Sequence, residues 1–155
     1  MAYRLACDHS DLIAAIIAIC SASYQGSHFD DKCSPRHPVH TLAVHGVQDN
    51  LVPYRGKRNF ASAEENIIRW AQKVNGCTGT SVAASPYLDT NRVYRGDSRL
   101  GWGGRLSLVV PQRFTDGCLA ETELWSVDQT GHCPYMDSLN LYWLLDKSNI
   151  VEPEV

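Results

Sequence analysis

The sequence predicts a single α/β domain with a mostly parallel sheet and flanking helices. Apolar segments of strand length, at 12–20 and 39–45, lack the alternation of half-buried strands, which is typical of parallel strands covered on both faces. A segment with helical periodicity at 62–74 and a further strand-like segment at 122–127 follow them. Because strands alternate with helices, we expect a parallel sheet. A chain of 155 residues is long enough for one buried core. We assign this domain to residues 1–148 and a flexible C-terminal tail to residues 149–155.

The composition narrows the class of protein. With 44% hydrophobic and 20% charged residues the chain is globular, and no apolar run approaches the ~20 residues of a membrane-spanning helix. The net charge of -3 argues against a nucleic-acid binder, which carries a basic face. Six cysteines in a chain of this size indicate an oxidising compartment.

The N-terminal segment has two interpretations. Arg4 followed by the apolar run 12–20 is also the pattern of a secretory signal. Asp8 and Asp11 stand directly before that run, where a signal is positively charged. We therefore expect a short helix from Ala2 to about Cys7, a turn, and then a buried strand over 12–20.

The middle of the chain alternates loop, strand and helix. Residues 24–38 are polar with Gly and Pro and predict a loop, and 39–45 predicts a central strand. Ser62, which is followed by the acidic residues Glu64 and Glu65, predicts the start of a helix, and Asn75-Gly76 predicts its end. Its inward stripe is expected to comprise Ile67, Ile68, Ala71 and Val74.

The second half of the chain is less regular. The stretch 77–116 is weakly patterned, with a short strand expected at 106–110, whereas 122–127 predicts a third core strand. A closing helix is expected at 137–146, with its leucines facing inward. We expect core positions for three of the four tryptophans, Trp70, Trp125 and Trp143, and an exposed position among glycines for Trp102.

Two loops that follow predicted strands carry the candidate catalytic residues. Asp49 lies just after the strand 39–45, and His132 lies just after the strand 122–127. In open α/β sheets catalytic groups gather at this edge of the sheet. An acid after one strand and a histidine after the last strand form the second half of a Ser–Asp–His order. Asp49 would orient the imidazole, and His132 would act as general base and then as general acid.

The motifs around these loops resemble a known family. The chain is similar to the C-terminal part of feruloyl esterases and polyhydroxybutyrate depolymerases, which are secreted α/β-hydrolases. The acid motif of that family, His-Gly-x-x-Asp followed by Val-Pro-Tyr, is matched by His45, Gly46, Asp49, Val52, Pro53 and Tyr54. The helix 1–7 and the strand 14–19 also match the family pattern. The remaining matches are a loop cysteine (Cys33), a helical tryptophan (Trp70) before Asn75-Gly76-Cys77, a later cysteine (Cys118) and a Gly-His loop (Gly131-His132).

The resemblance implies a carboxylic ester hydrolase that needs no metal or organic cofactor. It also implies a Cys77–Cys118 disulfide, with Cys7–Cys33 as a second pairing, and an extracellular location. The substrate would be a feruloyl or acetyl ester of plant cell walls or a polyester. The sequence contains no Gly-x-Ser-x-Gly elbow, so the nucleophile-bearing N-terminal part of the fold is absent from the 155 residues. We therefore expect the C-terminal half of an α/β-hydrolase, inactive as an isolated fragment.

Other interpretations of the same residues stay open. Asp49 is also a good turn residue, His132 suits an ordinary exposed loop, and His45 is expected to be packed or hydrogen-bonded rather than a base. Among the cysteines, Cys20 is expected to be a buried thiol and Cys133 to be free. The alternative function is a non-catalytic half-hydrolase that binds a partner or carbohydrate. Such a half would expose a sheet edge through which the chain self-associates.

Overall fold

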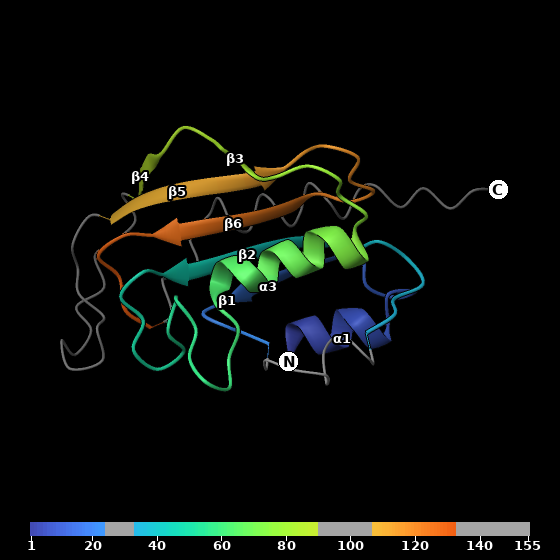
Figure 1. Cartoon of the computed structure of the whole chain (residues 1–155), viewed down its shortest axis with the longest axis horizontal. Helices are drawn as coiled ribbons and strands as arrows, with labels where there is room; N and C mark the ends of the chain where they lie inside the picture. The colour runs from blue at the N-terminus through green and yellow to red at the C-terminus, as the bar shows by residue number, and fades with distance from the viewer. Residues whose placement is uncertain (24–32, 90–106, 133–155) are drawn as a thin grey trace.

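The computed structural model describes residues 1–23, 33–89 and 107–132. One mixed sheet has the strand order β1-β2-β6-β5-β3, and β4 also pairs with β5 (Figure 1). The strands are β1 (Ala15–Ile19), β2 (His40–Gly46), β3 (Val82–Ala83), β4 (Tyr87–Asp89), β5 (Ser107–Phe114) and β6 (Thr122–Val127). The helices are α1 (Ala2–Asp8) and α3 (Ala63–Arg69), and α3 continues into the π-helical turn η1 (Trp70–Val74).

The sheet is mixed, so the expectation of a mostly parallel sheet was wrong. β1, β2 and β6 are parallel neighbours, but β5 is antiparallel to β6, β3 and β4. The arrowheads of β2 and β6 point the same way in Figure 1, and that of β5 points the opposite way. The difference arises in the weakly patterned stretch 77–116, where β3 and β4 precede a β5 that is longer than the expected 106–110. Antiparallel strands need only short connections, so no helix is required between them.

Both described helices cover the same face of the sheet. Figure 1 shows α3 in front of the strands and α1 beside it, below β1. Alternate residues of β1, β2 and β6 point toward them, because side chains of a strand alternate between faces. The side chains buried between the helices and this face of the sheet are Tyr3, Ala6, Ile16, Ala18, Val39, Ala43, Ile67, Trp70, Ala71, Phe114 and Leu124. On the opposite face a second cluster is buried, comprising Leu42, Val44, Val109, Trp125 and Val127.

Several expected elements are confirmed, with local differences at their ends. The helix at the N-terminus and the strand 122–127 occur where the sequence predicts them. The first strand begins at Ala15 rather than Leu12, because residues 9–12 form a turn and Leu12 is 80% exposed. Ile68 does not belong to the inward stripe, since it is 40% exposed while Ile67 is buried.

The helix α3 begins with the cap that its sequence predicts. The Ser62 hydroxyl accepts the Glu65 N–H at 3.1 Å, and the Glu65 carboxylate accepts the Ser62 N–H at 2.9 Å. This reciprocal capping box satisfies two backbone donors that helix starts leave unpaired. At the other end Gly76 has a φ of +66°, as expected for the glycine that follows a helix.

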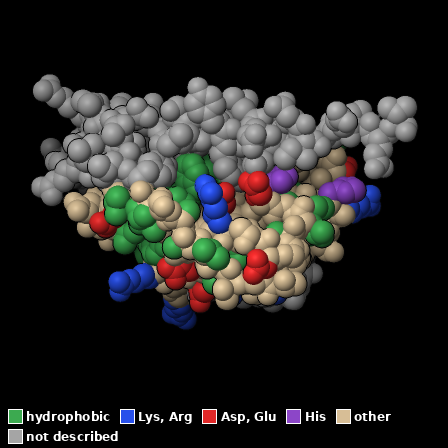
Figure 2. Space-filling view, turned by 90° about the horizontal axis from the view of Figure 1, so that it is seen from above, with side chains coloured by type: hydrophobic (Ala, Val, Ile, Leu, Met, Phe, Trp, Pro, Cys, Tyr) green, Lys and Arg blue, Asp and Glu red, His purple; other side chains and the backbone are tan. Residues whose placement is uncertain are grey.

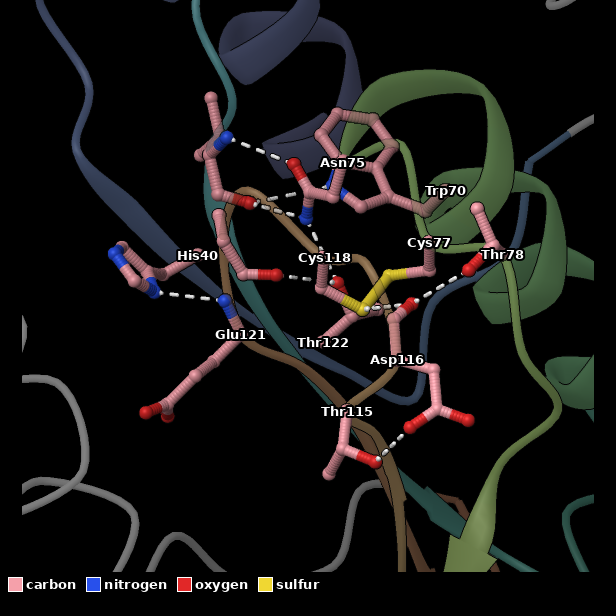
Figure 3. The surroundings of a disulfide bond; sticks show 12 residues. His40, Trp70, Asn75, Cys77, Thr78, Thr115, Asp116, Cys118, Glu121 and Thr122 are labelled. Carbon is pink, nitrogen blue, oxygen red and sulfur yellow. Dashed lines mark hydrogen bonds between the residues drawn. A yellow bond between two sulfur atoms is a disulfide. The ribbon is translucent and has the colours of Figure 1, made fainter.

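A buried amide and a disulfide join the end of this helix to the start of two strands (Figure 3). The Asn75 side chain accepts the Val39 N–H at 3.0 Å and donates to the Val39 carbonyl at 2.9 Å and to Thr122 Oγ1 at 2.7 Å. Beside it lies the Cys77–Cys118 disulfide, the pairing that the family resemblance implies. The amino ends of β2 and β6 are thus fixed to each other through the helix terminus.

The remaining cysteines are partly as expected. Cys7 and Cys33 form a second disulfide and connect α1 to the chain that leads into β2. Cys20 is disulfide-bonded, so the expectation of a buried free thiol was wrong. Its backbone φ of 42° is unusual for a residue other than glycine. Trp70 and Trp125 are buried as expected.

Some expectations fall outside the described residues. These concern most of the loop 24–38, the helix 137–146, the tail 149–155, Trp102, Trp143 and Cys133. Within the described part of the chain, no helix is long and apolar enough to cross a bilayer. On the face drawn in Figure 2, acidic and basic side chains are interspersed among apolar ones.

Candidate active site

The two candidate loops meet at the carboxyl ends of β2 and β6. The strands pair in parallel from Thr41 with Thr122 to Gly46 with Val127, so the residues that follow them leave the sheet at the same edge. Main-chain hydrogen bonds then continue beyond the strands. Val47 donates to the Val127 carbonyl at 3.0 Å, and Gln48 donates to the Thr130 carbonyl at 2.9 Å. The sheet pairing therefore determines how far apart the two loops lie.

Gly46 is the position at which the loops are closest. A Cβ atom on this residue would lie 2.1 Å from the Gly131 carbonyl oxygen and 2.4 Å from the Thr130 carbonyl oxygen. Real Cβ atoms do not approach backbone oxygens this closely, so only glycine fits here. The glycine of the His-Gly-x-x-Asp motif is thus required by the packing of one loop against the other.

Asp49 and His132 are in direct contact. His132 Nδ1 lies 2.9 Å from Asp49 Oδ2. The Asp49 side chain is fully buried, whereas the His132 side chain is 26% exposed. The imidazole therefore has one nitrogen on a buried carboxylate and still reaches solvent. This is the arrangement in which a carboxylate fixes the tautomer of a general base, although the catalytic roles of both residues stay predictions.

The turn around Asp49 holds its carboxylate in place. Asp49 Oδ1 accepts the Leu51 and Val52 N–H groups, both at 2.9 Å. Aspartate commonly closes a turn in this way. Both interpretations of Asp49 from the sequence thus describe the same side chain: one oxygen closes the turn and the other contacts His132.

The turn before His132 contains an unusual backbone conformation. Gln129 has a φ of 52°, which is uncommon for a residue other than glycine. Asp128 stabilises the turn, since its carboxylate accepts the Gln129 N–H at 2.8 Å and its carbonyl accepts the Thr130 hydroxyl at 3.2 Å. This conformation brings the chain from β6 back toward the acid loop within a few residues.

His45 and Tyr54 complete the buried part of the site. His45 Nε2 lies 2.9 Å from the Val52 carbonyl oxygen and 3.2 Å from Asp49 Oδ2. As expected from the sequence, His45 is packed and hydrogen-bonded; its contact with the candidate acid was not predicted. The Tyr54 ring meets the His45 ring edge-on at 5.7 Å, and its hydroxyl lies 2.7 Å from Ser126 Oγ. The pKa of the Tyr54 hydroxyl is raised, mainly because the side chain is buried.

A cavity of about 590 Å³ lies at the opposite end of β6, lined in part by His40, Arg113 and Glu123. Glu123 is already paired there, with Arg113 Nε at 3.1 Å and Trp125 Nε1 at 2.7 Å. Among residues 1–23, 33–89 and 107–132, no three His, Cys, Asp or Glu side chains converge as a metal site would require. The Asp49–His132 pair is therefore the candidate that the geometry favours.

Comparison with known proteins gives one partial match and no matching family model. The chain is similar to feruloyl esterase B of Piromyces equi, with 36% identity over 91 residues. The alignment covers 52% of the chain and 16% of that protein, so the chain corresponds to a small part of the relative's length. This similarity supports an esterase-like relationship at a coarse level.

Proposed function

We propose that this chain carries the acid and base of a carboxylic ester hydrolase. The observation that carries the proposal is the contact between His132 Nδ1 and the fully buried Asp49 carboxylate. A proton on Nδ1 is held by that carboxylate, and Nε2 is then left unprotonated as a base. The coarse similarity to an esterase supports an ester as the substrate.

The proposed reaction is acyl transfer to a serine followed by hydrolysis. His132 Nε2 takes the proton of the serine hydroxyl as its oxygen attacks the ester carbonyl, and then gives that proton to the departing alcohol. In the second half-reaction His132 takes a proton from water, which attacks the acyl-enzyme, and returns it to the serine. Asp49 stays ionised throughout and stabilises the imidazolium.

We place the serine and the oxyanion-hole amides outside the 155 residues, in a longer polypeptide that precedes them. The sequence lacks a Gly-x-Ser-x-Gly elbow, and without a nucleophile we expect no turnover from the 155-residue chain. The feruloyl or acetyl ester of a plant cell wall, or a polyester, is the proposed substrate. We also propose that the protein works outside the cell, because disulfides persist in oxidising surroundings.

The test is hydrolysis of an activated aryl ester and of methyl ferulate. The gene is first read upstream of residue 1, and the polypeptide that includes any Gly-x-Ser-x-Gly elbow is expressed. In it, His132→Gln should lower kcat by ~10⁶-fold without changing the melting temperature, because it removes the base and keeps the fold. His9→Gln, in the exposed turn after α1, is the matched control and should retain full activity. Unchanged turnover in the His132 variant would contradict the proposal.

The second candidate is a non-catalytic half-hydrolase that associates through its sheet edge. Among the described strands β1 pairs on one side only, with β2, and its side chains at Ile17 and Ile19 are half-buried. Unpaired strand edges are templates for association. Sedimentation of the 155-residue chain across a hundredfold concentration range tests this candidate. A monomer at every concentration would exclude self-association, and an in-frame stop codon just before residue 1 would favour the non-catalytic role.

A further inference from the structure

His45 is the buried imidazole next to the candidate acid–base pair. It lies one residue before the end of β2, where it pairs with Ser126 of β6, and its side chain is 3% exposed. The ionisable groups that face it are Asp49, His132 and the hydroxyl-bearing ring of Tyr54. The proposed reaction gives His45 no role, so its contacts need a separate explanation.

The protonation of one His45 nitrogen follows from its partners. Nε2 lies 2.9 Å from the Val52 carbonyl oxygen, which can only accept a hydrogen bond. Nε2 must therefore carry the proton. Nε2 also lies 3.2 Å from Asp49 Oδ2, so the proton on this nitrogen is next to the carboxylate as well. Burial lowers the pKa of His45 below its ordinary value of 6.5, so the ring is neutral near pH 7 with its single proton on Nε2.

Four nitrogen atoms surround the Asp49 carboxylate. Oδ1 accepts two backbone N–H groups, from Leu51 and Val52. Oδ2 has two imidazole nitrogens within reach, those of His45 and His132. A carboxylate offers about four acceptor positions, so every position faces a nitrogen. With the proton of His45 Nε2 placed beside Oδ2, that oxygen can only accept from His132, and His132 must supply the proton between them.

We propose that His45 is a positioning residue that holds Asp49 Oδ2 as an acceptor and thereby keeps His132 in the tautomer with its proton on Nδ1. The proposal rests on the proposed function only in that Asp49 and His132 are the acid and base. Its content is a pair of tautomers, which are measured without any ester hydrolysis. A merely structural His45 would satisfy the Val52 carbonyl and leave the tautomer of His132 unchanged.

The experiment is two-bond ¹H–¹⁵N correlation NMR on the whole 155-residue chain, labelled with ¹⁵N at histidine. In the wild-type chain we expect the neutral form of His45 to carry its proton on Nε2 and the neutral form of His132 to carry its proton on Nδ1. A His45 ring with its proton on Nδ1 would overturn the proposal. So would a His132 ring with its proton on Nε2. Because this measurement uses no variant, the proposal stays testable even if substitutions at this buried position impair folding.

Two substitutions then separate positioning from packing. His45→Leu fills the space but removes the donor, and we expect His132 to change from a single tautomer to a mixture. His45→Gln keeps a side-chain N–H, and we expect it to retain the Nδ1 tautomer of His132. His40→Gln, at the other end of β2, is the matched control and should leave His132 as in the wild type. A single Nδ1 tautomer in the His45→Leu chain would show that the backbone donors suffice and would overturn the proposal.

The result is distinguishable from the test of the proposed function. If the longer polypeptide hydrolyses no ester, the function fails while the tautomers can still be as proposed. If His132→Gln abolishes hydrolysis but His45→Leu leaves the His132 tautomer unchanged, the function stands and the role of His45 falls.

Discussion

The two ends of the strand pair β2 and β6 are each held by one buried polar side chain. At the amino ends this side chain is the Asn75 amide, and at the carboxyl ends it is the Asp49 carboxylate. Asn75 makes three hydrogen bonds, two with Val39 and one with Thr122. Asp49 has four nitrogens around its two oxygens. The amide is neutral and all its partners are structural, whereas one partner of the carboxylate is an imidazole that reaches solvent. The contacts at the amino ends therefore only hold the strands together, whereas those at the carboxyl ends also orient a solvent-accessible imidazole.

The histidines at the two ends show the same contrast. His40 Nδ1 accepts the Glu121 backbone N–H at 3.0 Å, so a neutral His40 carries its proton on Nε2 (Figure 3). His132 Nδ1 faces a carboxylate, so a neutral His132 carries its proton on that same nitrogen. Two chemically identical side chains at opposite ends of one pair of strands are thus expected in opposite tautomers. The partner of Nδ1, rather than the residue type, decides which nitrogen is free to act as a base.

The largest effect is expected at Gly46. Gly46→Ala should lower the free energy of unfolding by about 4 kcal/mol or more and separate Asp49 from His132, because the new Cβ meets two backbone oxygens. Gly76→Ala is the matched control at the amino end. Its Cβ would lie 3.6 Å from a Leu119 side-chain carbon, so only the left-handed backbone costs energy, about 1–2 kcal/mol. Urea denaturation of both variants measures the difference, and equal losses would contradict it.

The next effect is expected from the Cys77–Cys118 disulfide. Replacing both cysteines by alanine should lower stability by about 4 kcal/mol, from loop-closure entropy over a sequence separation of 41. We expect the His132 tautomer to be unchanged in the folded protein, because the disulfide lies at the amino ends of the strands. Denaturation and histidine NMR on the same sample test both statements. A changed tautomer would show that the two ends are coupled.

A smaller effect is expected at Asn75. Asn75→Ala leaves the buried N–H and carbonyl of Val39 without their side-chain partner, and we expect a loss of about 3 kcal/mol. Gln72→Ala, at an exposed position of the same helical segment, is the control and should change stability by less than about 0.5 kcal/mol. A similar melting temperature for both variants would mean that the amide does not join the two strands as described.

The smallest effect is a pH dependence from His45. Since its folded-state pKa lies below 6.5, the unfolded chain takes up this proton first as the pH falls, and stability decreases below about pH 6.5. The slope from one such group is at most about 1.4 kcal/mol per pH unit. Urea denaturation between about pH 7 and pH 5 measures it. His45→Gln should flatten this part of the curve, and an unchanged slope would assign it to other groups.

Local signals in the sequence predicted much of this structure. The Ser62 cap and the Gly76 end fix a helix through nearby hydrogen bonds and backbone preference, so they are readable from a few residues. Asp49 and His132 were found because each follows a strand, and parallel pairing brings the ends of strands together. The contact between these two residues is thus a consequence of topology.

Features that depend on distant partners were not predicted. The antiparallel pairing of β5 with β6 is set between segments whose own pattern is weak. His45 and Asp49 are only four residues apart in sequence. Their contact nevertheless depends on the turn that folds Val52 back toward the end of β2. The disulfide at Cys20 likewise cannot be read from its apolar surroundings. For the contact between His45 and Asp49, the available signal was a histidine followed four residues later by an aspartate.

The main-chain bonds that join the two loops also have a consequence for engineering. Because Val47 and Gln48 connect the loops through backbone N–H groups, their side chains contribute nothing to that connection. Both side chains are exposed, as is Leu51, which is 60% exposed and flanks the buried Asp49. A combinatorial library over these three positions would vary the exposed side chains next to Asp49, while the distance from the Asp49 carboxylate to the His132 imidazole stays constant. The surroundings of the Asp49–His132 pair could thus be varied without altering the residues that position it.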